Sequence, residues 1–233
     1  MGRRSRVEAP PDRFVMQAIG IFGGTFDPVH YGHLRTGFEL IERLALSELR
    51  FIPCAHPPHR PAPRTPGRLR LRMLQAAIRG EPRFVADGRE LERPGPSYTV
   101  ETLESLRADL PGRALCLVLG MDAFLGLPGW YRWQQLLELA HIVVAHRPGW
   151  QVPDTGTLGE LIRARRTASA AELAEGAGRI YVEPVTQLEI SSTELRAGIQ
   201  AGVDPRYLVP DLVRQIILDT ECYAEETTER INA

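Results

Sequence analysis

The segment AIGIFGGTFDPVHYGH, residues 18–33, decides the expected fold. Its first five residues form a short apolar run, which is typical of a strand buried on both faces of a parallel sheet. Gly23 and Gly24 follow as a turn that lets backbone approach a ligand closely, and a helix start just beyond it favours bound anions. His30 and His33 lie three residues apart at that helix start, so both imidazole rings can face one side. The segment therefore predicts a strand, a phosphate-binding turn and a helix.

The same alternation of apolar runs and amphipathic stretches continues along the chain. It predicts an α/β fold, a Rossmann-like doubly wound parallel sheet with helices on both faces, in a single domain. The alanine-rich stretch 155–178 is interpreted as a variable excursion from this pattern. Strands are expected at 18–22, 49–53, 84–86, 114–119, 141–145 and 180–182, and helices at 34–44, 69–78, 99–110, 133–139, 192–201 and 210–218.

Loops that follow the strands are expected to carry the chemistry. Right-handed crossovers bring every strand-to-helix loop to one edge of a parallel sheet, where ligands bind. We expect a shared cleft lined by the loops at 23–33, 53–67, 87–98, 120–132 and 146–150. Residues 1–17 are interpreted as a disordered N-terminal extension, 18–223 as the domain and 224–233 as a tail.

Composition excludes several classes of function. All 28 basic residues are arginine, so Schiff-base lysine chemistry, pyridoxal-phosphate catalysis and a P-loop lysine are excluded. A net charge of −1 argues against a nucleic-acid binder. No apolar stretch is long enough to cross a membrane. Three widely spaced cysteines without a Cys-x-x-Cys pair fit a reducing, cytoplasmic location.

A metal site is an alternative interpretation of the histidine-rich region. Asp27, His30 and His33, joined by His56 or His59, offer zinc-ligating atoms. The His-x-x-His spacing lacks the glutamate of the zinc-binding His-Glu-x-x-His helix, and no cysteine pair supports it. We therefore predict no metal site built from protein side chains.

The quoted segment resembles the signature of the nucleotidyltransferases, and its GGTFDPVHYGH form is similar to that of the bacterial nicotinate-nucleotide adenylyltransferases. Six further segments resemble that family in order, over roughly residues 18–223. They are Pro57–Arg60, Pro96–Thr99, Gly120–Asp122, Trp130-Tyr131, His146–Gly149 and Ile190–Arg196. The resemblance implies adenylyl transfer from ATP to nicotinate mononucleotide, with magnesium held mainly by the ATP phosphates.

Site residues also follow from the resemblance. It implies that His30 and His33 are catalytic and contact the ATP phosphates, and that Trp130 stacks on the pyridine ring. The other ATP-binding positions would be Gly24, Thr25, Phe26, Gly120, Asp122, Arg147, Ser191, Ser192, Thr193 and Arg196. The nicotinate mononucleotide would be bound by His59, Arg60, Thr99, Trp130 and Tyr131.

Other interpretations remain open at this stage. Ser191-x-x-Glu194 has the spacing of a helix capping box, which is compatible with phosphate binding by the same segment. A pantetheine-phosphate type adenylyltransferase is a rival within the superfamily, although it would leave the Trp130-Tyr131 and Pro96–Thr99 segments unexplained. A non-catalytic nucleotide sensor is a rival from another class. The oligomeric state is left open by the sequence.

Overall fold

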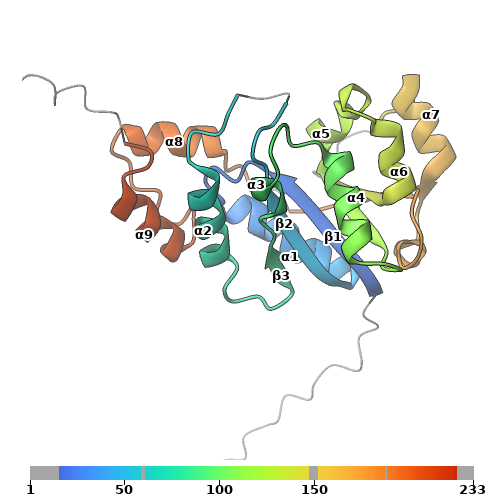
Figure 1. The fold of residues 1–233 in the computed structure, drawn as a ribbon, viewed down its shortest axis with the longest axis horizontal. Helices are drawn as coiled ribbons and strands as arrows, with labels where there is room; N and C mark the ends of the chain where they lie inside the picture. Colours follow the sequence, from blue (N-terminus) through green and yellow to red (C-terminus); the bar gives the residue numbers. More distant parts are fainter. Residues whose placement is uncertain (1–15, 59–60, 147–151, 187, 225–233) are drawn as a thin grey trace, which may run out of the picture.

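The computed structural model describes residues 16–58, 61–146, 152–186 and 188–224, and these form a seven-stranded parallel sheet between two layers of helices (Figure 1). Its strand order is β3-β2-β1-β4-β5-β7-β6. The strands are β1 (Met16–Gly24), β2 (Leu46–Pro53), β3 (Phe84–Ala86), β4 (Leu115–Gly120), β5 (His141–His146), β6 (Arg166–Thr167) and β7 (Ile180–Pro184). The expected doubly wound α/β fold is confirmed.

Both faces of the sheet are covered by helices. The helices are α1 (Tyr31–Leu44), α2 (Gly67–Ala77), α3 (Arg89–Glu92), α4 (Thr99–Asp109), α5 (Met121–Leu125), α6 (Leu136–Leu139), α7 (Gly156–Arg165), α8 (Ser192–Gln200) and α9 (Asp211–Thr220). Short 3-10 turns lie at Leu127–Gly129, Trp133–Gln135 and Ala170–Leu173. None of the described helices is long and apolar enough to span a membrane.

Strand β4 shows how one sheet supports two hydrophobic cores. Cys116 and Val118 face a core built with α1, α2 and α9, whereas Leu115, Leu117 and Leu119 face a core built with α4 to α7. All five side chains are buried, as the continuous apolar run ALCLVL indicates for a strand covered on both sides. In Figure 1, α9 lies beside α2, so the last helix of the described chain packs on the β2 side of the sheet.

The direction of winding reverses between β1 and β4. The chain runs from β1 outward through β2 to β3, and then returns to place β4 on the other side of β1. Such a reversal leaves a crevice at the carboxyl ends of the two central strands, which is where ligands bind in open α/β sheets. The fold therefore places its ligand site beside Gly24 and Gly120, the last residues of β1 and β4.

Several boundaries and elements differ from the sequence expectations. Strand β1 begins at Met16, which pairs with Leu46 in β2, two residues before its expected start. The expected helix 133–139 consists of a 3-10 turn followed by the four-residue helix α6. The excursion 155–178 contains the ten-residue helix α7 and the two-residue strand β6, which extends the sheet beside β7. Alanine-rich composition and a very short edge strand give no clear periodicity.

Candidate active site

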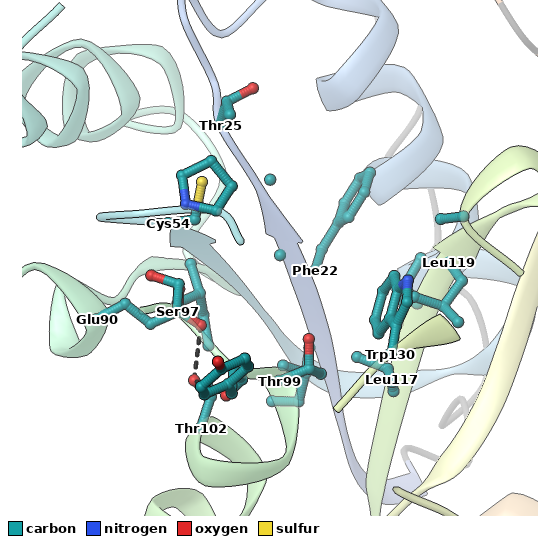
Figure 2. A pocket seen from close by; sticks show the side chains of 18 of the residues that line it. Phe22, Thr25, Cys54, Glu90, Ser97, Thr99, Thr102, Leu117, Leu119 and Trp130 are labelled. Carbon is teal, nitrogen blue, oxygen red and sulfur yellow. Dashed lines mark hydrogen bonds between the residues drawn. The ribbon is translucent and has the colours of Figure 1, made fainter. Parts of the chain in front are cut away.

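A pocket of about 430 Å³ opens at the reversal point between β1 and β4 (Figure 2). Its floor is formed by the last residues of these two strands, and its walls by the loops after β2, before α4 and after α5. The predicted site residues among its lining are Gly24, Thr25, Thr99, Gly120, Asp122, Trp130 and Tyr131. Four of the five loops expected to share a cleft therefore do so; residues 147–151 lie outside the described residues.

One half of the pocket is aromatic and suited to a flat ring. Figure 2 shows Trp130 on one side of the pocket, Glu90 and Ser97 on the other, and Thr99 between them. Thr99 is the first residue of α4, so its N–H is one of those that a helix leaves without an intrahelical acceptor. An aromatic face beside a helix N-terminus can hold a flat ring that carries a negative group.

Tyr131 also lines the aromatic half of the pocket. Its ring lies against that of Tyr98 with 4.4 Å between centroids, and it is half exposed. Trp133 packs against the same hydrophobic core as Trp130, but unlike Trp130 it does not line the pocket. The two tryptophans thus have different roles although they stand three residues apart.

The glycines of the pocket floor serve two purposes. A Cβ atom at Gly23 or Gly120 would meet no atom within 4 Å, so each leaves open space beside the pocket. A Cβ atom at Gly24 would lie 3.0 Å from the ring of Phe26. Gly24 is therefore required by the packing of Phe26 beneath the turn, whatever ligand the turn binds.

Phe26 itself does not reach the pocket with its side chain. The ring is fully buried, with edge-on contacts to Phe22, His33 and Phe51 at centroid distances of 5.9, 5.0 and 5.8 Å. Its backbone has a φ of 47°, which is uncommon for a residue with a large side chain. Only the backbone of Phe26 can therefore make the predicted ATP contact, because its ring is packed in the core.

The two motif histidines form a stacked pair at the start of α1. Their ring centroids are 3.7 Å apart with an interplanar angle of 27°. The backbone N–H of His30 donates to Nδ1 of His33 at 3.3 Å, which assigns the proton of a neutral His33 ring to Nε2. Nδ1 of His30 is buried and has no hydrogen-bond partner among the described residues. A buried ring nitrogen without a partner is costly unless a ligand supplies one.

Burial keeps both imidazoles neutral in the free protein. It lowers the pKa of His30 from its ordinary 6.5 to about 4. It also lowers the pKa of His33 well below the ordinary value, with a further contribution from the neighbouring His30. At neutral pH the pair thus offers N–H donors, and a bound polyanion would raise both pKa values and favour protonation.

Helix α8 begins beside the histidine motif. The hydroxyl of Ser191 accepts the N–H of Glu194 at 3.5 Å, which confirms its role as the N-cap of the helix. Ser192 donates its hydroxyl to the carbonyl of Pro28 at 3.1 Å, within the loop that leads to His30. Residues 164 positions apart in sequence are thus brought together at one edge of the sheet.

Arg196 joins the same two segments. One of its guanidinium nitrogens donates to the carbonyl of Asp27 at 2.7 Å, and another to the hydroxyl of Thr193 at 3.3 Å. A guanidinium has five N–H donors, so these two contacts leave further donors for an anion. Ser191 to Arg196 do not line the pocket itself, but their contacts place them next to the histidine motif.

Asp122 and the remaining predicted residues are placed less completely. Asp122 stands in the first turn of α5, exposed on the pocket rim, two residues beyond the N-cap Gly120. His59, Arg60 and Arg147 lie outside the described residues. Pro57 and Pro58, the last described residues before His59, do line the pocket.

Known proteins align with this chain over most of its length. The cytidylyltransferase-like family model matches residues 21–198. A probable nicotinate-nucleotide adenylyltransferase of Methylococcus capsulatus is 47% identical over 209 residues, which are 89% of this chain and 100% of that protein. One of Halorhodospira halophila is 48% identical, over 89% of this chain and 96% of its own. The chain belongs to the nicotinate-nucleotide adenylyltransferase family.

Solved structures agree with the fold of this adenylyltransferase family. A nicotinic acid mononucleotide adenylyltransferase of Plasmodium falciparum, complexed with NaAD, aligns with a TM-score of 0.67 at 17% identity. The alignment covers 88% of this chain and 97% of that one. A putative nicotinate-nucleotide adenylyltransferase of Vibrio parahaemolyticus aligns with a TM-score of 0.61, also at 17% identity. At this identity the likeness concerns the fold.

Sequence reasoning missed Glu90, a buried carboxyl group in the pocket wall of this adenylyltransferase. Thr102 donates its hydroxyl to Glu90 at 2.6 Å, and burial raises the pKa of the carboxyl group. Ser97, also a hydrogen-bond partner of Glu90, accepts the N–H groups of Ala55 and His56 at 2.9 and 3.2 Å. Glu90 therefore joins the loop after β2 to the start of α4. Its local sequence, Arg-Glu-Leu-Glu, resembles an ordinary solvated helix turn.

Asp27 joins three distant parts of the chain by hydrogen bonds. Its carboxylate accepts the hydroxyl of Tyr223 at 2.6 Å and the N–H groups of Arg64 and Thr65 at 2.8 and 3.4 Å. The described residues contain no cluster of three or more histidine, cysteine or acidic side chains able to hold a metal ion. Tyr223 was missed because its partner lies 196 residues away in sequence.

Proposed function

We propose that this chain transfers the adenylyl group of ATP to nicotinate mononucleotide, giving nicotinate adenine dinucleotide and pyrophosphate. A phosphate oxygen of the mononucleotide attacks the α-phosphorus of ATP, and the bond from that phosphorus to the bridging oxygen of the β-phosphate breaks. The substrate supplies the nucleophile, so the protein has to align two anions and stabilise the charge on the departing pyrophosphate. The observation that carries the proposal is the position of the histidine pair beside the aromatic pocket: neither histidine lines the pocket, but Phe22 does, and its ring centroid lies 6.4 Å from that of His33.

The triphosphate is assigned to the side of the histidine motif. His30 and His33 would donate to its oxygens, and His30 Nδ1 would gain the partner that it lacks among the described residues. The N-terminus of α8 and Arg196 lie beside the pair and supply further donors. Gly120 and Asp122 would hold the nucleoside, because an acidic side chain at such a strand end suits ribose hydroxyls. Arg147 is assigned by family resemblance to the adenine.

The mononucleotide is assigned to the aromatic half. Trp130 would stack on the pyridine ring while N–H groups of Thr99 and Tyr131 hold its carboxylate. Such donors suit a carboxylate, whereas an amide brings NH₂ donors of its own that would face them. The pocket is therefore expected to prefer nicotinate over nicotinamide. His59 and Arg60 are assigned to the phosphate of the mononucleotide.

Magnesium is proposed to arrive with ATP, held by phosphate oxygens and water. The donor set fits this arrangement, because Asp27 is occupied by three hydrogen bonds and no metal-holding cluster occurs among the described residues. When bound, the ion would neutralise phosphate charge.

A labelling experiment tests the reaction. Purified full-length chain is incubated with nicotinate mononucleotide, magnesium and ATP labelled at either the α- or the γ-phosphate. The proposal expects α-label in the dinucleotide and γ-label in pyrophosphate. Release of the α-label as AMP would contradict it, and so would the absence of labelled dinucleotide and labelled pyrophosphate. His30→Ala and His33→Ala together serve as the control for a contaminating activity.

A further inference from the structure

Arg70 is a fully buried arginine that the proposed reaction has not used. It lies on α2, is 1% exposed, and donates to three backbone carbonyls. Its donors reach the oxygens of Thr25 at 2.6 Å, Cys54 at 2.7 Å and Thr65 at 3.0 Å. Thr25 and Cys54 directly follow strands β1 and β2, and both line the pocket. One guanidinium thus fixes the ends of two neighbouring strands at the pocket.

The charge of Arg70 has no carboxylate partner within the described part of the chain. Ion pairs link most of the other arginines that are partly buried, but none includes Arg70. An arginine stays protonated in proteins, and a buried charge without a counter-ion is costly. The three carbonyl dipoles offset part of this cost. A polyphosphate bound on the other side of the turn would offset more, because charges interact more strongly at low dielectric.

The carbonyl of Thr25 also determines where the next N–H group points. The carbonyl oxygen of Thr25 and the amide hydrogen of Phe26 belong to one planar trans peptide, so they point in opposite directions. Because Arg70 holds the oxygen, the N–H of Phe26 is directed away from Arg70. No described residue accepts a hydrogen bond from this N–H. The φ of 47° at Phe26 is a disfavoured conformation that needs such an external restraint.

From these observations we propose that Arg70 is a positioning residue for polyphosphate binding. It holds the Thr25–Phe26 peptide so that the N–H of Phe26 faces the triphosphate of a nucleotide, and it adds a fixed positive charge behind that peptide. Its contact with the carbonyl of Cys54 also fixes this turn relative to the end of β2. The inference rests on the proposed function for the identity of the ligand, but the geometry concerns any polyphosphate at the turn.

Arg107 provides a matched control. It also donates to three backbone carbonyls, those of Leu139 and Arg113 at 2.6 Å each and that of Gly176 at 3.2 Å. These carbonyls precede β5, β4 and β7, so they lie at the amino edge of the sheet, away from the pocket. Losing Arg107 removes similar hydrogen bonds without touching the phosphate turn.

The experiment compares Arg70→Met, Arg70→Lys and Arg107→Met. Each variant is examined for its urea midpoint, for kcat and KM of ATP, and for binding of inorganic tripolyphosphate by calorimetry. We expect Arg70→Met to lower kcat by about 10²-fold, because the N–H of Phe26 would no longer be held as a preorganised donor. Tripolyphosphate affinity should fall by at least about 10-fold, and Arg70→Lys should recover part of it because the charge remains. Arg107→Met should lower the urea midpoint while kcat stays within about threefold.

Two results would overturn the proposal. One is a folded Arg70→Met enzyme whose kcat and tripolyphosphate affinity both stay within threefold of the wild type. The other is Arg107→Met lowering kcat as much as Arg70→Met does. If Arg70→Met does not fold, Arg70→Lys carries the same comparison. Failure of the wild type to form dinucleotide would refute the proposed reaction alone, because tripolyphosphate binding tests Arg70 independently of turnover.

Discussion

Acidification should destabilise the protein through His30, and replacing His30 by glutamine should remove that effect. Burial lowers the pKa of His30 from 6.5 to about 4. The folded protein therefore keeps the imidazole neutral at a pH where the unfolded chain protonates it. Stability from this group is fully present above pH 6.5 and is lost as the pH falls toward 4. A histidine paired with an acidic side chain has the opposite effect, because its contribution to stability is lost as the pH rises.

The size of the effect follows from the pKa difference. Each pKa unit corresponds to about 1.36 kcal/mol, so the full effect is about 3 kcal/mol, and about 2 kcal/mol of it appears between pH 7 and pH 4.5. His30 is only 5% exposed, so solvent screening reduces this value little. The loss is comparable with that from a large cavity in a core and is readily measured.

Urea unfolding at pH 7 and at pH 4.5 measures the effect. The wild type and His30→Gln share all other titrating groups, so the difference between their pH dependences reports His30 together with its effect on the pKa of His33. We expect His30→Gln to lose about 2 kcal/mol less on acidification than the wild type does. His56→Gln, which removes an exposed histidine, is the control and should behave like the wild type. Equal pH dependence of the wild type and His30→Gln would refute the assignment of a buried, neutral imidazole.

Three further substitutions test separate parts of the site. Trp130→Ala should raise KM for the mononucleotide at least about 10-fold with little change in KM for ATP, since stacking on a base or ring is worth about 1–3 kcal/mol; steady-state kinetics that show equal changes in both would contradict the assignment. His33→Ala should lower kcat by about 10²–10³-fold while ATP binding measured by calorimetry changes much less, and an unaltered kcat would remove its catalytic role. Tyr223→Phe should lower the free energy of unfolding by about 1–3 kcal/mol, because it leaves the buried carboxylate of Asp27 short of a donor; an unchanged urea midpoint would show that this hydrogen bond is not needed.

The fold was predictable where the sequence of a single strand shows that both of its faces are buried. The run 114–119 is apolar at every position because β4 is covered on both faces, and it identified the centre of the sheet. Helix α7 and strand β6 were missed because α7 has a weak apolar stripe and β6 has two residues. Their structure depends on packing against the edge of a sheet that must already exist.

The site was predictable where its residues are close in sequence. His30 and His33 share one helix start, and their stacking follows from that spacing. Arg70 stands on the apolar stripe of α2 with Met73 and Leu74, and an arginine on such a stripe was the available signal for a buried charge. Tyr223 gave no signal, because its hydrogen bond to a distant aspartate exists only in the folded chain.

The preference between two mononucleotides tests the central claim most directly. Pyrophosphate release is measured with saturating ATP and with nicotinate mononucleotide or nicotinamide mononucleotide as the acceptor. The account predicts a kcat/KM for the nicotinate form at least about 10-fold higher, because the backbone N–H groups of Thr99 and Tyr131 suit a carboxylate. Equal kcat/KM values, or a higher value for nicotinamide mononucleotide, would contradict the assignment of these N–H groups to a carboxylate.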